Sequence, residues 1–133
     1  MSGIVIIGAG QAGSSLAIKL RTLGYEGAVT LIGEEPFAPY QRPPLSKTYL
    51  LGEMALERLY LLPEELYRDQ NIELRLAAQV TAIDPVAGVV SLGHETLAYD
   101  QLALTTGSTP RLLPEAIGGG LKNVFAVRGL ADV

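Results

Sequence analysis

The stretch that most constrains the fold is residues 4–13, in which four β-branched apolar residues lead into a Gly-x-Gly-x-x-Gly turn. A continuous β-branched run predicts a strand that is buried on both faces. The glycines suit a tight turn at Gly8, a close backbone approach at Gly10 and close helix packing at Gly13. Because the first N–H groups of a following helix lack intrahelical partners, they can receive an anion. The stretch predicts the beginning of a nucleotide site.

A helix, a second strand and an acidic pair follow this turn at the spacing of a nucleotide-binding βαβ unit. We expect the helix at residues 12–23 and the strand at residues 28–32. Glu34 then lies about 20 residues beyond the last glycine, where such a unit places an acid against a ribose. A carboxylate at this position would accept ribose hydroxyls and repel a 2′-phosphate. The alternative is that Glu34 and its neighbour Glu35 only solvate a strand end.

Composition excludes several classes of function. The chain has 133 residues, enough for one domain, and its net charge of −4 argues against a nucleic-acid surface. No apolar run approaches the roughly 20 residues of a membrane helix, and the first strand follows the N-terminus directly, without a signal peptide. Cysteine is absent and the single histidine, His94, lies in a predicted hairpin turn, so we expect no disulfide and no metal site. A cytoplasmic protein is predicted, with neither a nucleic acid nor a membrane as partner.

A proline-rich segment at residues 36–47 follows the acidic pair. Four prolines in nine residues cannot continue a helix or a central strand, so they predict a stiff loop, with a short helix near its end that stops at Gly52. The loop presents Arg42, Ser46 and Lys47, and it would lie along an extended dinucleotide. The alternative is a surface loop with two solvated cations.

The rest of the chain predicts an α/β fold, a parallel sheet with a small antiparallel β-meander. Residues 102–105 are apolar enough to return to the central sheet, and Thr106 and Gly107 follow them. Short strands are expected from Val80 to Thr105, among them residues 89–92 and 96–99, and a last short strand is expected at residues 124–127.

Residues 39–47, Pro-Tyr-Gln-Arg-Pro-Pro-Leu-Ser-Lys, resemble the FAD domain of the ferredoxin, rubredoxin and putidaredoxin reductases, whose fold apoptosis-inducing factor shares. The resemblance runs over the whole chain, and it includes a helix at residues 63–70 and the segments at residues 71–74 and 79–84. It is slightly weaker at Thr105, where alanine is usual. It implies a Rossmann-like FAD-binding domain of the glutathione-reductase type. That domain would be incomplete, because residues 1–133 correspond to its N-terminal part, without the NAD-binding and C-terminal interface domains.

The resemblance also implies a set of site residues. The implied cofactor-binding residues are Gly8, Gly10, Gln11, Ala12, Gly13, Glu34, Glu35, Arg42, Lys47, Val80, Thr106, Gly107 and Arg128. Lys47 is the implied catalytic residue, because an ammonium beside the flavin stabilises the negative charge that hydride delivery places on the ring system. Without the resemblance, Arg128 would be a solvated end charge, and Thr106 with Gly107 an ordinary turn.

The function that this resemblance implies is electron transfer. The whole enzyme would pass a hydride from NADH, bound by the absent domain, to FAD, and then single electrons to a ferredoxin or rubredoxin-type partner that serves an oxygenase or cytochrome P450. The lack of cysteine in residues 37–49 supports this output, because disulfide reductases of the same fold carry a cysteine pair. We expect this fragment alone to be inactive, and its exposed sheet edge to favour a homo-oligomer. The alternatives are a stand-alone NAD-binding module and a non-catalytic interaction domain.

Overall fold

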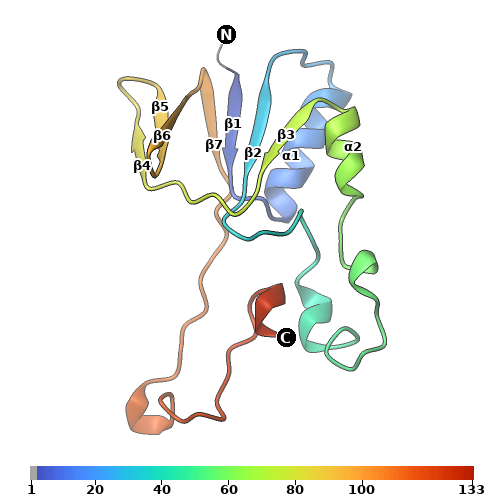
Figure 1. The fold of residues 1–133 in the computed structure, drawn as a ribbon, viewed down its shortest axis with the longest axis vertical. Coiled ribbons are helices and arrows are strands. Elements are labelled where there is room, and N and C mark those ends of the chain that lie inside the picture. Colours follow the sequence, from blue (N-terminus) through green and yellow to red (C-terminus); the bar gives the residue numbers. More distant parts are fainter. Residues whose placement is uncertain (1–2) are drawn as a thin grey trace. The chain divides into compact units, whose positions relative to one another are not determined.

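The computed structural model describes residues 3–133, which divide into two compact units. The first unit combines Met1–Tyr40 with Tyr60–Gly107, and the second combines Gln41–Leu59 with Ser108–Val133. Both β-sheets and both α-helices belong to the first unit (Figure 1). The second unit is built from loops and short 3-10 helices. Within residues 3–133, the structure has no helix with the length and apolar character that crossing a membrane requires.

A four-stranded parallel sheet organises the first unit, with the strand order β3-β2-β1-β7. The strands are β1 (Ile4–Ile7), β2 (Val29–Ile32), β3 (Ile72–Arg75) and β7 (Gln101–Leu104). Every neighbouring pair is parallel, so β1 lies between β2 on one side and β7 on the other. The predicted parallel sheet and the return of the late strand to that sheet are confirmed. The carboxyl ends of β1, β2 and β7 therefore meet at one edge of the sheet.

The two helices cover one face of this sheet and the antiparallel strands cover the other. Ile4 and Ile6 of β1 pack in a buried cluster with Ala17 of α1 (Gln11–Thr22) and Tyr67 of α2 (Glu64–Asp69). Val5, between them in sequence, packs instead with residues of β2 and of the antiparallel sheet. Because successive side chains of a strand point to opposite faces, a continuous apolar run fits a strand with a layer on each side.

The antiparallel sheet is the predicted meander, with the strand order β4-β5-β6. Its strands are β4 (Ala82–Asp84), β5 (Val89–Leu92) and β6 (Glu95–Ala98). Gly88 and Gly93 lie in the two connecting turns with φ of +68° and +70°. The short strands expected from Val80 onward begin only at Ala82, although the Thr81 N–H still bonds to Ser91 O at 2.8 Å.

Two expectations for the second unit need correction. The strand predicted at residues 124–127 is wrong, because these residues run irregularly and no strand of the described chain pairs with them. A β-branched and aromatic composition permits a strand, but a partner backbone is needed to form one. The helix expected near the prolines is a single 3-10 turn, η1 (Pro43–Ser46), followed by turns up to Gly52. The other 3-10 turns are η2 (Leu56–Arg58), η3 (Glu115–Ile117) and η4 (Leu130–Asp132).

The Arg21 side chain ties together two connections at the amino-terminal edge of the sheet. Its guanidinium donates to the carbonyls of Tyr25 at 2.6 Å and Gly27 at 2.8 Å, both in the connection from α1 to β2. It also donates to the carbonyls of Gln70 at 2.8 Å and Asn71 at 2.7 Å, in the connection from α2 to β3.

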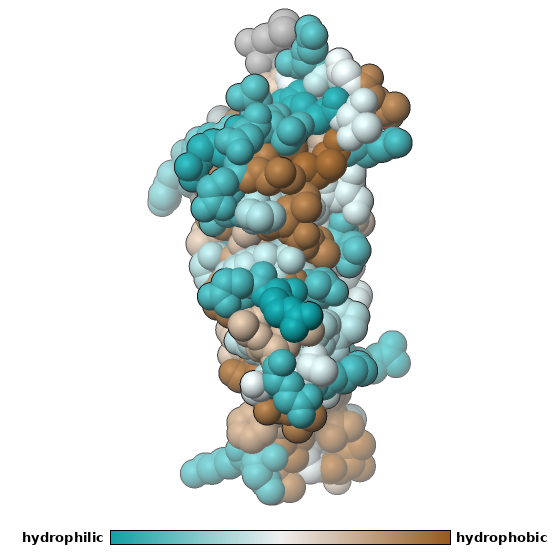
Figure 2. All heavy atoms as spheres, turned by 90° about the vertical axis from the view of Figure 1, so that its right-hand side faces the viewer, coloured by the Kyte–Doolittle hydropathy of each residue, from teal (hydrophilic) through white to brown (hydrophobic). Residues whose placement is uncertain are grey.

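On the side of the molecule that carries these helices, apolar surface lies between hydrophilic side chains (Figure 2).

Candidate functional site

The turn after β1 has the conformation that its glycines predict. Gly8 has a φ of +109°, which L side chains rarely adopt. Its N–H donates to the Ile32 carbonyl of β2 at 2.8 Å. A Cβ at Gly8 would lie 2.1 Å from the carbonyl oxygen of Thr105, which follows β7. The first glycine is therefore required both by its backbone angle and by the close approach of β7.

The second and third glycines meet opposite environments. Gly10 is the N-cap of α1, and a Cβ built on it would have no atom within 4 Å. Gly13 is buried, and a Cβ on it would lie 2.1 Å from the Gly8 carbonyl oxygen and 3.0 Å from Leu31 Cδ1. Gly13 thus lets the helix lie against the turn and the sheet. Gly10 leaves open space at the helix end, where a ligand backbone could approach.

The N-terminus of α1 is prepared for an anion. The first intrahelical bond runs from the Ser14 N–H to the Gly10 carbonyl at 3.0 Å. The N–H groups of Gln11, Ala12 and Gly13 have no acceptor among the residues that the structure describes. No side chain caps this end, and the first turn carries no acid. Unpaired donors and the positive end of the helix dipole both favour a phosphate group here.

Thr105 makes a contact that the sequence did not predict. Its hydroxyl donates to the Gly8 carbonyl at 2.8 Å and lies 3.2 Å from the Ile7 carbonyl oxygen. Its own N–H donates to the same Ile7 carbonyl at 2.9 Å. The residue that departs from the family's alanine therefore bonds to the first fingerprint glycine. Its departure from the pattern was the signal that could have found it.

The two acids after β2 differ in their surroundings. Glu34 is exposed and has no hydrogen-bond or ion-pair partner among residues 3–133. Glu35 is half-buried, and its Oε2 accepts a hydrogen bond from the Tyr40 hydroxyl at 2.6 Å. The preceding Gly33 packs against the glycine turn, because a Cβ on it would lie 2.7 Å from Ala9 Cβ. Glu34 is thus the acid that is free to meet a ligand beside the turn.

Three further predicted residues of the first unit lie in two places. Thr106 and Gly107 are exposed and follow β7, at the same sheet edge as the glycine turn, and Gly107 has a φ of +69°. Val80 packs with the cluster of Val5 and Val90, between the two sheets. Its side chain serves the core, so any contact with a ligand would come from its backbone.

The three predicted cations belong to the second unit. Arg42 donates through Nη1 to the carbonyl of Arg128 at 2.8 Å, and Arg128 donates through Nε to the carbonyl of Ser108 at 3.0 Å. The Asp132 carboxylate accepts the N–H groups of Gly129 at 2.7 Å and Arg128 at 2.9 Å. These two bonds, that of Gly129 first, lower the pKa of Asp132 below its ordinary 3.8. Two of the predicted cations are therefore brought together.

Lys47, the predicted catalytic residue, is exposed in the same unit. Its Nζ donates to the Pro43 carbonyl at 3.2 Å, across the 3-10 turn η1. Arg42 and Arg128 instead donate to the carbonyls of Arg128 and Ser108, elsewhere in the unit. The family resemblance alone placed Arg42, Lys47 and Arg128 at one site. The structure connects only two of them among the described residues, through the hydrogen bond from Arg42 to the Arg128 carbonyl.

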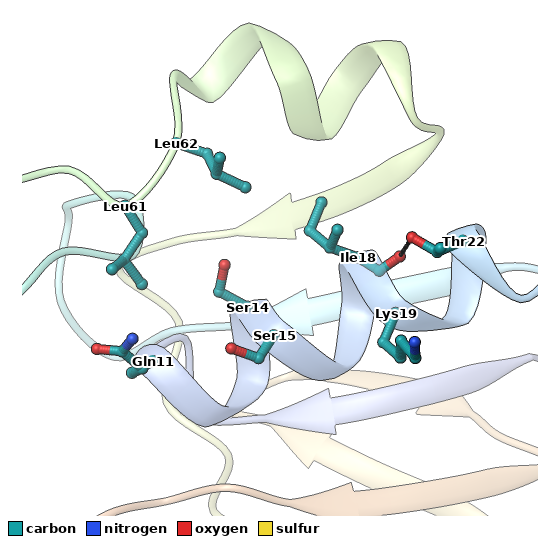
Figure 3. A pocket seen from close by; sticks show the side chains of 8 residues that line it. All are labelled: Gln11, Ser14, Ser15, Ile18, Lys19, Thr22, Leu61 and Leu62. Atoms are coloured by element: carbon teal, nitrogen blue, oxygen red, sulfur yellow. Dashed lines mark hydrogen bonds between the residues drawn. The ribbon is translucent and has the colours of Figure 1, made fainter.

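A groove of about 380 Å³ runs along α1 from its first residue, Gln11, to Thr22. Leu61 and Leu62 form one wall, and polar side chains of α1 face them (Figure 3). Ser14, at its base, is already hydrogen-bonded to the Tyr67 hydroxyl at 2.7 Å. Gln11 also lines this groove, so its predicted role at the turn would fall to its backbone N–H.

Comparison with known proteins agrees with this geometry. The family model described as pyridine nucleotide-disulphide oxidoreductase matches residues 2–133. The chain belongs to this family. Putidaredoxin reductase CamA of Pseudomonas putida is 43% identical over 132 residues, which cover 97% of this chain and 31% of that protein. Rhodocoxin reductase of Rhodococcus erythropolis is 46% identical over 126 residues, covering 94% of this chain and 29% of that protein.

Solved structures support membership of the pyridine nucleotide-disulphide oxidoreductase family. The crystal structure of a covalent putidaredoxin reductase–putidaredoxin complex aligns with a TM-score of 0.91 and 43% identity, over 98% of this chain and 32% of that one. The chain spans about a third or less of the length of the relatives named here. These relatives are oxidoreductases, and membership of this family implies FAD and NAD(H) as redox groups.

The residues of the first unit fit the ADP half of FAD. A diphosphate needs unpaired donors and space, which the α1 N-terminus and the open side of Gly10 provide. A ribose needs an acceptor for its hydroxyls, and Glu34 is an exposed carboxylate without a protein partner in the described chain. Both features lie at the carboxyl edge of the sheet, beside β1, which has β2 on one side and β7 on the other. Open α/β sheets bind their ligands at this kind of edge.

Proposed function

We propose that this chain is the FAD-binding part of an NADH-dependent flavoprotein reductase. Its electron acceptor would be a ferredoxin or rubredoxin-type iron–sulfur protein that serves an oxygenase or cytochrome P450. The observation that carries the proposal is the glycine turn itself. Open space at Gly10 adjoins the unpaired N–H groups of the α1 N-terminus, and Glu34 follows β2 at the same edge of the sheet. The relatives include a putidaredoxin reductase and a rubredoxin-NAD(+) reductase, and their names support this class of acceptor.

In this proposal the first unit binds the ADP half of the cofactor. The N–H groups of Gln11, Ala12 and Gly13 would donate to the pyrophosphate, and Glu34 would accept the ribose hydroxyls. A hydrogen bond to a charged group contributes about 1.5–3 kcal/mol, so Glu34 would account for a large part of the affinity. Glu35 would act through Tyr40, which holds its carboxylate and so shapes the loop behind Glu34. The same negative charge would disfavour a ribose 2′-phosphate.

The second unit would contribute cations to the isoalloxazine half. FAD, when bound, supplies the chemistry that converts a two-electron hydride into single electrons. Lys47 is the proposed catalytic residue, because its exposed ammonium can stabilise negative charge on a neighbouring ring system. Arg42 and Arg128 are proposed as further FAD contacts, and the bond of Arg42 to the Arg128 carbonyl would hold together the two segments of the second unit that carry them. NADH binding is assigned to a separate domain.

The test is a calorimetric titration of the chain with FAD, ADP and NAD. We expect FAD and ADP to bind, FAD more weakly than in a complete reductase, and the Glu34→Gln variant to lose ADP affinity by about 10- to 100-fold. Glu26→Gln is the matched control, because Glu26 is an exposed acid that precedes β2, at the opposite end of the strand from Glu34. Tight NAD binding without flavin affinity would instead favour a stand-alone NAD module. Binding of neither nucleotide would favour an interaction domain.

Activity provides a second test. We expect no NADH-dependent ferricyanide reduction by this chain, with or without added FAD, because the proposed NADH site lies elsewhere. Turnover by the chain alone would contradict the proposal that NADH binds to a separate domain. The same preparation with the flavin photoreduced is the positive control for electron transfer to ferricyanide.

We also propose that the chain self-associates through β7. This strand is at the edge of the parallel sheet, and Leu104 at its end is 63% exposed. An unpaired strand edge can pair with a second chain. Light scattering over a concentration series should show a dimer, and a strictly monomeric mass at high concentration would exclude it.

A further inference from the structure

The Thr105 hydroxyl lies under the turn that the proposed function assigns to a pyrophosphate. It is 2.8 Å from the Gly8 carbonyl oxygen, to which it donates. It also lies close to the third glycine, because a Cβ on Gly13 would be 2.9 Å from Thr105 Oγ1. The carbonyl oxygen of Thr105 in turn approaches Gly8, whose added Cβ would lie 2.1 Å away. One residue after β7 therefore contacts both ends of the fingerprint.

Gly8 is held from both neighbouring strands. On one side its N–H donates to Ile32 of β2 at 2.8 Å, and on the other its carbonyl accepts the Thr105 hydroxyl. A peptide group is planar, with its C=O and the next N–H pointing in opposite directions. Fixing the Gly8 carbonyl therefore fixes the direction of the Ala9 N–H and the entry of the chain into the turn. Fixing a glycine costs the most conformational entropy, because its backbone has the most conformations to lose.

We propose that Thr105 is a positioning residue that holds the Gly8–Ala9 peptide in the conformation that receives a dinucleotide pyrophosphate. This inference rests on the proposed function and deepens it. Alanine at this position could pack against Gly13 but could not donate to Gly8. The hydrogen bond from the Thr105 hydroxyl restrains the otherwise flexible Gly8–Ala9 peptide before a ligand binds. A turn that is preorganised in this way loses less conformational entropy on binding.

The experiment compares three variants of this chain. Thr105→Val keeps the branched shape and removes the donor, whereas Thr105→Ser keeps the donor and removes the methyl group. Thr30→Val is the matched control, because the Thr30 hydroxyl on neighbouring β2 donates to Glu73 Oε2 at 3.3 Å, outside the turn. Each protein is titrated with ADP by calorimetry. The exchange rate of the Gly8 amide, whose N–H donates to Ile32, is measured by NMR without ligand.

We expect Thr105→Val to weaken ADP binding roughly three- to tenfold, the effect of one lost hydrogen bond, and to speed exchange of the Gly8 amide. Thr105→Ser and Thr30→Val should stay within about twofold of the parent chain in both measurements. Thermal unfolding, recorded in parallel, separates general destabilisation from a local effect at the turn.

Three results would overturn the inference: unchanged ADP binding by Thr105→Val, an equal loss in Thr30→Val, or no rescue by Thr105→Ser. Failure of the proposed function looks different. If the parent chain does not bind ADP, the nucleotide role is refuted for the whole site. In that case, faster exchange of the Gly8 amide in Thr105→Val would show that the hydrogen bond stabilises the turn without serving nucleotide binding.

Discussion

Replacing the second and third glycines of the fingerprint by alanine should separate ligand binding from folding. At Gly10 the added methyl group would enter open space, with no described atom within 4 Å. At Gly13 it would lie 2.1 Å from the Gly8 carbonyl oxygen, a distance that real Cβ atoms do not reach. The same chemical change is therefore free of protein contact at one position and blocked by backbone at the other.

The magnitudes follow from these surroundings. Gly10 has φ −97° and ψ −160°, which alanine can adopt, so its substitution should change the free energy of unfolding by less than about 1 kcal/mol. The methyl group would occupy the space of a phosphate, and losing charge-assisted bonds of about 1.5–3 kcal/mol predicts a 10- to 100-fold weaker ADP complex. Overpacking at Gly13 costs about 1–3 kcal/mol, and the rigid carbonyl contact places it at the upper end. The helix-propensity gain of about 1 kcal/mol offsets only part of that cost.

The assay combines urea unfolding, followed by circular dichroism, with ADP titration of the same samples. Gly10→Ala should unfold with the parent chain and bind ADP poorly, whereas Gly13→Ala should unfold at lower urea. Full ADP affinity in a folded Gly10→Ala protein would refute the reasoning, because the open space would then not be where the diphosphate lies. An unchanged urea midpoint for Gly13→Ala would show that the helix can move away from the turn at little cost.

Three further outcomes are expected. Arg21→Gln removes guanidinium bonds to four backbone carbonyls, so the free energy of unfolding in urea should fall by about 2–3 kcal/mol; a loss below about 0.5 kcal/mol would contradict its structural role. Burial raises the pKa of Tyr67 above its ordinary 10.0, against a smaller lowering by the Ser14 bond. The protonated Tyr67 hydroxyl therefore contributes its full stabilisation of the folded state below pH 10, and this contribution is lost as pH rises through the raised pKa. Tyr67→Phe should remove this dependence and so flatten the alkaline fall of thermal stability. The lowered pKa of Asp132 means that its turn is stabilised above pH 3.8 and released as pH falls through the lowered value; a carboxyl NMR titration at or above 3.8 would contradict this.

Much of the fold was predictable because local patterns and tertiary packing agree. The β-branched run of β1 predicts a strand covered on both faces, and the structure places helices against Ile6 and the antiparallel sheet against Val5. The turn glycines Gly88 and Gly93 marked the meander correctly. The strand expected at residues 124–127 failed for the opposite reason, since composition carries no information about whether a partner strand is present.

The candidate site was predictable in its backbone and less so in its side chains. The glycine spacing located the turn, and the helix N-terminus followed from it. The choice between Glu34 and Glu35 could not be made, because it depends on the Tyr40 hydroxyl that engages the second acid. Thr105 stood out only as a departure from the alanine that the family resemblance implies. Its contact with Gly8 could not be predicted, since the two are far apart in sequence and meet only when β7 pairs with β1.

The pairing of β1 with β7 has a consequence for how the protein is made. Ile7 emerges from the ribosome early, but its partner Leu104 is synthesised only after nearly the whole first unit. Contacts between residues so distant in the chain close slowly, because a long loop must be ordered first. In a nascent polypeptide the glycine turn would therefore be incomplete, and it could bind its nucleotide only after β7 has been synthesised and has paired with β1. Cofactor supply would then stabilise finished molecules by mass action and leave incomplete ones to proteolysis.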